Sequence, residues 1–185
     1  MNTTPSTIIP AGTWTADPAH STIGFAVKHM GIATVRGSFG EFAGTVELGD
    51  DLAAAKISGS VQTASIDTAE AQRDEHLRSS DFFDAETYPQ LLFESTAIEA
   101  IDDETFEVTG ELTMHGVTHP ITLKAVLQGA DTDPWGGERV GLEITGQLSR
   151  SDWGMKFNMA LGSGNLLVAD TVKLAFDISA VKQAA

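Results

Sequence analysis

The sequence predicts an all-β protein: an eight-stranded antiparallel up-and-down barrel with a helix capping one end. Three observations lead to this fold class. Apolar and polar residues alternate strictly through much of the chain, most connections between the alternating segments are short, and one stretch rich in helix formers lies between residues 67 and 89. Strict alternation is typical of antiparallel strands with one buried and one wet face. About eight such segments in chain order favour a closed barrel over the alternative, a two-sheet sandwich.

The second half of the chain shows the alternation most clearly, at residues 106–114, 121–127, 140–148 and 172–178. The first half repeats it with more noise at residues 23–29, 42–48, 57–65 and from 91 onward, with an expected kink at Gly40. With 185 residues, of which 42% are hydrophobic, the chain can build one domain with a sizeable core. We therefore expect a flexible N-terminal segment at 1–11 and a single domain at 12–185.

Two connections are long enough to have a structure of their own. Asp67 and Glu70 have the spacing of a capping box, which predicts a helix from Ala69 to Ser80. A short turn with Phe82 and Phe83 follows, and at least one of these rings must be buried, as a plug or a gate of the barrel mouth. The second connection, residues 151–170, is apolar and contains glycine, and long loops of this kind commonly serve a site.

Four glycines fall on the apolar faces of predicted strands: Gly44, Gly59, Gly110 and Gly146. Two interpretations stay open. Missing side chains would open an apolar tunnel in a barrel whose interior is only just filled, or the glycines would let the strands bend. On the tunnel interpretation, Gly110→Leu is expected to block the tunnel while the barrel stays folded.

The predicted topology brings several polar and aromatic residues to one rim. Odd-numbered strands end at the same rim, which places His29, His115, Arg150 and the loop with Trp153 beside the helix. The opposite rim has mostly acidic turns. His29 and Arg150 either make structural hydrogen bonds just past the barrel end or contact the head group of a ligand. The asymmetry suits an amphiphile with an apolar tail and a polar head.

Charge and composition exclude several classes of function. The net charge of −15 argues against a nucleic-acid partner and a polybasic membrane anchor, and the absence of cysteine excludes thiolate chemistry and disulfides. His115 and His119 have H-x-x-x-H spacing, but Gly116 interrupts it, so we expect no metal, and no cofactor, since nucleotide-binding motifs are absent. Without a secretion signal or a stretch of ~18 apolar residues, we expect a cytoplasmic location and no stable membrane insertion.

Short blocks spread along the chain resemble the YceI-like family. They run in order from about Gly12 to Ile178 and include Asp17-Pro18-Ala19-His20-Ser21, Arg73-Asp74-Glu75-His76-Leu77, Asp81-Phe82-Phe83-Asp84 and Ser149-Arg150-Ser151-Asp152-Trp153-Gly154-Met155. The resemblance implies a lipocalin-like barrel whose lumen binds a polyisoprenoid or another long-chain lipid, and a role in transport or stress response.

The predicted site combines this resemblance with the strand phases. The expected lumen residues are Phe25, Phe39, Phe42, Gly44, Gly59, Phe93, Val108 and Gly110. The expected mouth residues are His29, Phe82, Phe83, His115, Arg150 and Trp153. We expect a non-enzymatic carrier or sequestering protein for an isoprenoid quinone-like lipid. The alternatives are an enzyme that uses His29 or His115 beside Arg150, and an empty barrel that binds a partner protein through its surface; a homodimer is also open.

Overall fold

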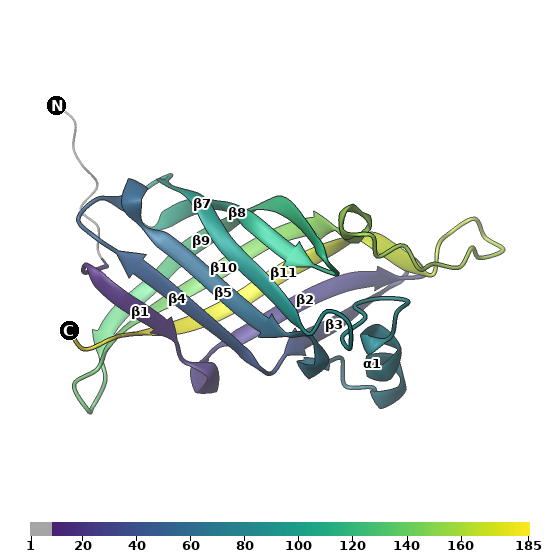
Figure 1. The fold of residues 1–185 in the computed structure, drawn as a ribbon, viewed down its shortest axis with the longest axis horizontal. Helices are drawn as coiled ribbons and strands as arrows, with labels where there is room; N and C mark the ends of the chain where they lie inside the picture. The colour runs from purple at the N-terminus through teal and green to yellow at the C-terminus, as the bar shows by residue number, and fades with distance from the viewer. Residues whose placement is uncertain (1–8) are drawn as a thin grey trace.

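A computed structural model describes residues 9–185 and confirms the predicted closed, eight-stranded, lipocalin-like antiparallel barrel (Figure 1). Most of the predicted flexible segment 1–11 lies outside the described residues. The strands are β1 (Gly12–Ala16), β2 (Thr22–His29), β3 (Ala33–Phe39), β4 (Phe42–Leu48), β5 (Lys56–Gln62), β6 (Ile66–Asp67), β7 (Gln90–Ala100), β8 (Thr105–Met114), β9 (Val117–Thr132), β10 (Glu138–Ser149) and β11 (Val168–Lys182).

The barrel has eleven strand segments because two of its strands are interrupted and β6 is a short addition. A 3-10 turn at Pro18–His20 separates β1 from β2, yet both pair with β11. In the same way β3 pairs with β2 and β4 pairs with β1, on either side of the predicted kink at Gly40. The pairing of β1 with both β4 and β11 closes the barrel.

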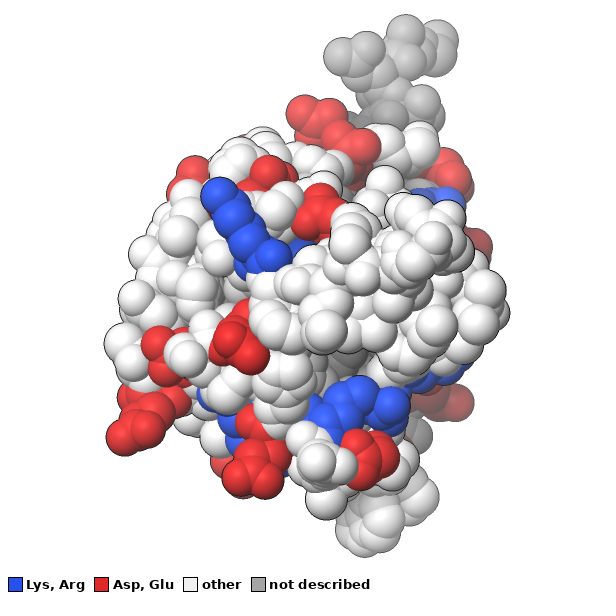
Figure 2. All heavy atoms as spheres, turned by 90° about the vertical axis from the view of Figure 1, so that its right-hand side faces the viewer, with Lys and Arg blue, Asp and Glu red and all other residues white. Residues whose placement is uncertain are grey.

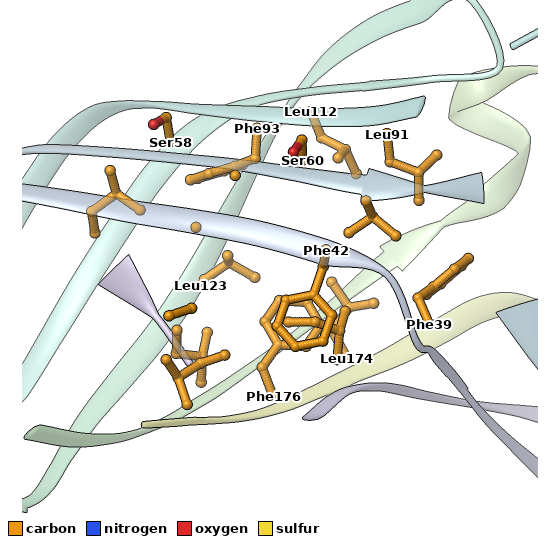
Figure 3. A pocket seen from close by; sticks show the side chains of 18 of the residues that line it. Phe39, Phe42, Ser58, Ser60, Leu91, Phe93, Leu112, Leu123, Leu174 and Phe176 are labelled. Atoms are coloured by element: carbon orange, nitrogen blue, oxygen red, sulfur yellow. The ribbon is translucent and has the colours of Figure 1, made fainter. Parts of the chain in front are cut away.

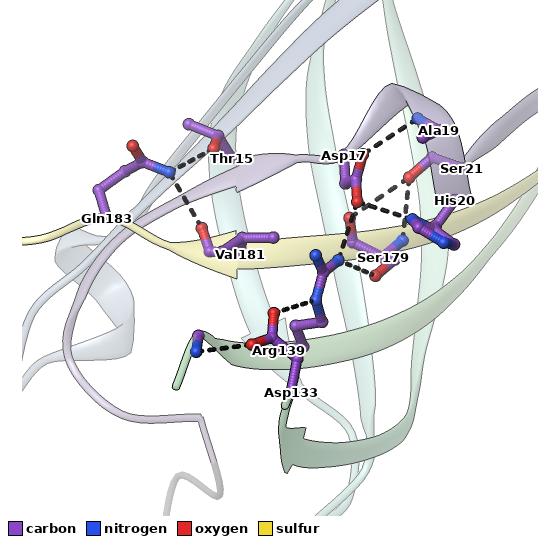
Figure 4. Close-up of polar contacts among 11 residues, drawn as sticks. Thr15, Asp17, Ala19, His20, Ser21, Asp133, Arg139, Ser179, Val181 and Gln183 are labelled. Atoms are coloured by element: carbon purple, nitrogen blue, oxygen red, sulfur yellow. Dashed lines mark hydrogen bonds and ion pairs between the residues drawn. The ribbon is translucent and has the colours of Figure 1, made fainter. Parts of the chain in front are cut away.

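An ion-pair network fastens this closing seam (Figure 4). Arg139, near the start of β10, donates from Nη1 to Asp17 at 2.9 Å and from Nε to Asp133 at 2.9 Å. Asp17 also accepts a hydrogen bond from the backbone N–H of Ala19 and contacts the ring of His20. The hydrogen bond from Arg139, followed by that from His20, lowers the pKa of Asp17 to about 2.

Replacing Arg139 tests how much this network contributes to acid resistance. In Arg139→Gln we expect the pKa of Asp17 to rise toward its ordinary value of about 3.9. Because the wild-type pKa is depressed, the Asp17 carboxylate stabilises the fold above about pH 4, and this contribution is lost as pH falls through about 2. The difference in free energy of unfolding between wild type and variant should therefore be largest at neutral pH and disappear near pH 2. Urea unfolding at several pH values, with an NMR titration of Asp17, measures both effects.

The helix is shorter than the sequence predicts. Helix α1 spans Ala71–Arg78 rather than Ala69–Ser80, and its N-cap is Glu70, whose carboxylate accepts from the N–H groups of Gln72 and Arg73. Ala69 has a φ of +62° in the left-handed region, so it cannot belong to the helix. Asp67 caps the preceding turn instead, by accepting from the N–H of Ala69. The predicted capping box is thus wrong in detail, although the helix does lie at the predicted end of the barrel (Figure 1).

Two apolar clusters occupy the barrel interior. One, toward the end away from α1, is formed by Trp14, Leu127, Val140 and Ala180, against which Ile9 packs. The other is larger and includes Trp153 and Met155, which come from the connection between β10 and β11. Among the described residues, no helix is long and apolar enough to cross a bilayer.

Candidate functional site: an apolar cavity in the barrel

The barrel encloses an apolar cavity of about 250 Å³. Figure 3 shows aromatic side chains from several strands directed into it, among them Phe42, Phe93 and Phe176. Apart from Thr45, Ser58 and Ser60, the residues that line it have apolar side chains or are glycine and alanine. No Asp, Glu, Lys, Arg or His belongs to this lining in the described chain, so its walls suit a hydrocarbon and not a charged ligand.

Seven of the eight predicted lumen residues line this cavity. They are Phe25, Phe39, Phe42, Gly44, Gly59, Phe93 and Val108. Alternation marked the inward phase of six of them, whereas Phe39 was predicted from the family resemblance alone. Whether they contact a ligand remains a prediction.

Gly110, the eighth, is not part of the cavity lining. A Cβ atom added there would overlap the ring of Phe93 and come within 2.6 Å of the carbonyl oxygen of Glu94. The absent side chain at Gly110 therefore gives room to Phe93, not to a ligand. Gly146 is similar, since an added Cβ would lie 2.6 Å from Cδ2 of Leu123. The prediction that Gly110→Leu would block a tunnel and leave the barrel intact is wrong on these contacts.

Gly44 and Gly59 do leave space in the barrel. They lie opposite each other on β4 and β5, and both line the cavity. An added Cβ at Gly59 would meet only the carbonyl oxygen of Ala43, at 3.7 Å, and one at Gly44 would make ordinary contacts with Ala16 and Ser58. Gly44 and Gly59 therefore fit the interpretation in which absent side chains widen the cavity. Gly110 and Gly146 instead leave room for neighbouring side chains, which neither interpretation predicted.

An alanine at each type of glycine should have opposite effects on stability. In Gly110→Ala, overlap with Phe93 and the Glu94 carbonyl is expected to destabilise the barrel by about 1–3 kcal/mol, as overpacking does. In the matched variant Gly44→Ala, which meets no close atom, reduced chain entropy of the unfolded state should stabilise the protein by about 0.4–1 kcal/mol. Urea unfolding of both variants checks this, and equal effects would refute the distinction.

Arg150 does not extend into the cavity. Its buried guanidinium donates to the carbonyl oxygens of Ala169, Met155, Phe157 and Val168, which uses four of its five N–H groups. Burial lowers the pKa of Arg150, while the charge of Asp170 opposes that shift. These bonds correspond to the structural interpretation of Arg150, in which it fastens the loop between β10 and β11. A contact with a ligand head group remains untested.

Trp153 is buried in the same apolar cluster as Met155, which lines the cavity. Its side chain is buried, its indole N–H donates to the carbonyl of Leu112 at 2.9 Å, and its own carbonyl lies 3.0 Å from Nδ1 of His115. The ring of His119 packs edge-on against the indole. His115, in the turn between β8 and β9, and His119, in β9, therefore both contact Trp153. Within residues 9–185 no group of three or more His, Cys, Asp and Glu residues could hold a metal.

The other mouth residues surround the same end. Phe82 is buried and packs against His76 and Phe157, between α1 and the loop. Phe83 packs edge-on against Phe39, a cavity residue, and its role as plug or gate stays a prediction. His29 lies half-buried at the end of β2, opposite Val168. None of the six predicted mouth residues belongs to the cavity lining itself.

Met155 is a lining residue that the sequence reasoning did not select. It lies in an irregular segment without periodicity, so no sequence signal marked its side chain as inward. Five lining residues of β11 were also left out of the predicted site: Val172, Leu174, Phe176, Ile178 and Ala180. Their strict alternation did mark them as inward, and it could have been used to include them.

An eight-stranded barrel around an apolar cavity defines the class of lipocalin-like β-barrels. Residues 14–180 match the family described as YceI-like domain, and the chain belongs to this family. It is 40% identical to Protein YceI of Escherichia coli O157:H7 over 145 residues, which cover 78% of this chain and 75% of that protein.

Two solved structures are similar to this barrel. One is the YCEI protein of Campylobacter jejuni, with 30% identity, a TM-score of 0.71 and coverage of 91% of this chain and 96% of the other. The second, described as a polyisoprenoid binding domain from Saccharophagus degradans implicated in plant cell wall breakdown, has 14% identity, a TM-score of 0.70 and coverage of 92% and 98%. At that identity the likeness concerns the fold alone.

Proposed function

We propose that the protein binds the tail of a long-chain isoprenoid lipid in its cavity, and carries or sequesters that lipid without transforming it. The observation that carries the proposal is the cavity lining, which is apolar over nearly its whole surface and includes Phe25, Phe93 and Phe176. The name of the Saccharophagus degradans domain, which describes polyisoprenoid binding on a similar fold, agrees with a lipid tail as the occupant.

Burial of the tail would supply the affinity. Each buried CH₂ contributes about 0.8 kcal/mol, so about ten buried carbons contribute about 8 kcal/mol before the entropy of association is subtracted. A cavity of about 250 Å³ lies just below the range of about 300–1,000 Å³ that ligand pockets span. This size favours a tail of a few isoprene units inside, with the rest of the molecule outside the barrel.

The hydrogen bonds of the mouth residues favour a lipid carrier over an enzyme. An enzyme would need His29 or His115 to transfer a proton to the bound lipid, with Arg150 beside it. Nδ1 of His115 is engaged by the Trp153 carbonyl, and most N–H groups of Arg150 bond to backbone carbonyls. An empty barrel used only as a binding surface would have a packed lumen, which the cavity argues against.

Native mass spectrometry of delipidated protein tests the proposal directly. We expect one-to-one adducts with polyprenyl alcohols and with an isoprenoid quinone, and weaker adducts with straight-chain alcohols of equal carbon number. The released molecule should be chemically unchanged. Refusal of every polyprenyl lipid would overturn the binding proposal, and recovery of an altered lipid that depends on His29 or His115 would replace the carrier with an enzyme.

The quinone-like head group, the cytoplasmic location and the homodimer remain predictions. Each has its own measurement: competition between quinone and alcohol head groups, fractionation of cells that express the untagged full chain, and sedimentation of the purified protein. A location outside the cytoplasm would leave the cavity chemistry unchanged but would change which lipid the barrel meets.

A further inference from the structure

Three large apolar side chains are exposed at the end of the barrel that carries α1. Ile32 lies in the turn between β2 and β3, and Met159 and Leu166 lie in the loop between β10 and β11. Their residues are 77%, 58% and 53% exposed, respectively. Core residues are far less exposed than this, so these side chains do not pack in the barrel interior. We name these three residues the apolar tip.

Backbone and side-chain hydrogen bonds hold the two segments of the apolar tip together. The N–H of Met30 donates to the carbonyl of Leu167 at 2.9 Å, and Nδ2 of Asn165 donates to the carbonyl of Met30 at 3.4 Å. Within the loop, the N–H of Leu167 donates to the carbonyl of Met159 at 2.9 Å. Figure 1 shows this loop reaching beyond the barrel at the end to which β2 points. The apolar tip is therefore one surface.

The charge around the apolar tip is opposite to that of the whole protein. Residues 28–39 and 153–169, which contain it, have no Asp or Glu but include Lys28, Arg36 and Lys156, in a chain of net charge −15. Figure 2 views this end: an uncharged bulge occupies the middle and right of the face, and Lys or Arg residues lie next to it above and below, together with some Asp and Glu. An exposed apolar centre with basic neighbours is typical of surfaces that insert into anionic lipid.

We infer that the apolar tip docks peripherally on an anionic lipid bilayer, with Ile32, Met159 and Leu166 in the interface and Lys28, Arg36 and Lys156 near the headgroups. Three side chains expose much less area than the about 800 Å² per partner of a stable protein interface, which favours a bilayer over a second copy of the chain. This surface is separate from the cavity, and docking would bring the Trp153 end of the barrel to the membrane.

Vesicle flotation with the full chain tests the inference. Vesicles of phosphatidylcholine with phosphatidylglycerol should bind the wild-type protein, and vesicles of phosphatidylcholine alone should bind it less well. The double variant Ile32→Asn/Leu166→Asn should lose at least about tenfold in binding, since burial of each side chain contributes on the order of tenfold. The variant Lys28→Gln/Lys156→Gln should bind the anionic vesicles at least about tenfold more weakly, and its binding to phosphatidylcholine vesicles should not change.

The matched control is Trp135→Ser, which removes an apolar side chain that is 88% exposed in the turn between β9 and β10, away from the apolar tip. Its vesicle binding should equal that of wild type. The inference is overturned if wild type fails to bind anionic vesicles, or if Trp135→Ser loses as much vesicle binding as the tip variant. It is also overturned if sedimentation shows that wild type is a dimer and the tip variant a monomer. Lipid uptake by the cavity, measured without vesicles, should be the same in wild type and tip variant, so this surface and the proposed function fail independently.

Discussion

Gly59→Leu is expected to abolish most lipid uptake while the barrel remains folded. An added Cβ meets no atom closer than 3.7 Å, and Gly59 lines the cavity opposite Gly44 and beside Phe93, so we expect the leucine side chain to occupy cavity space. Its four carbons displace about as many carbons of a lipid tail. At about 0.8 kcal/mol for each, the affinity should fall by more than about a hundredfold. Titration with a polyprenyl alcohol, followed by native mass spectrometry, measures the loss.

Gly49→Leu provides the matched control for this variant. Gly49 lies in the exposed connection after β4, and an added Cβ there has no heavy atom within 4 Å. The same side chain is therefore added outside the cavity, and uptake should equal that of wild type. If a folded Gly59→Leu protein takes up lipid as wild type does, the cavity is not where the lipid binds.

Arg150→Met is expected to destabilise the protein strongly. The methionine keeps much of the apolar stem but leaves the carbonyls of Ala169, Met155 and Phe157 without the guanidinium donor. An unsatisfied buried carbonyl destabilises by about 1–3 kcal/mol, and partial access of water to the loop lowers the sum, so we expect about 3 kcal/mol in total. For a chain of this length this corresponds to a decrease in Tm of roughly 6–12 °C.

The control for Arg150 is Arg36→Met, which removes an exposed arginine of β3. Its thermal unfolding should stay within about 0.5 kcal/mol of wild type, as for most surface substitutions. A stable Arg150→Met protein that has lost lipid binding would reverse our interpretation and assign Arg150 to the ligand head group.

Periodicity predicted the barrel because each strand has one face toward the lumen and one toward water. The sequence predicted the kink at Gly40, but it did not predict the 3-10 turn at Pro18–His20 that separates β1 from β2. The helix start was missed for a local reason: Asp67 and Glu70 have capping-box spacing, but the left-handed Ala69 between them separates a capped turn from a helix. The φ angle of Ala69 cannot be predicted from the spacing of Asp67 and Glu70.

Strand phase also located the cavity walls, but it could not tell which glycine leaves room for a ligand. Gly59 and Gly110 have the same phase signal, and the positions of the Phe93 ring and the Glu94 carbonyl distinguish them. For Arg150, sequence reasoning left a structural and a ligand-binding role open, because the acceptors of its guanidinium lie in an irregular loop. Contacts between segments that lack periodicity cannot be predicted from a single sequence.

The position of β11 at the closing seam has a consequence for synthesis of the protein. Strand β11 pairs with β10 along most of its length, and with β2 and β1 on its other side. The pairing of β1 with β11 is therefore one of the contacts that close the barrel. On the ribosome the barrel therefore cannot close until β11 has emerged. Until then the apolar wall of a nearly complete sheet is open to water, and the nascent chain is vulnerable to aggregation and a natural client for chaperones.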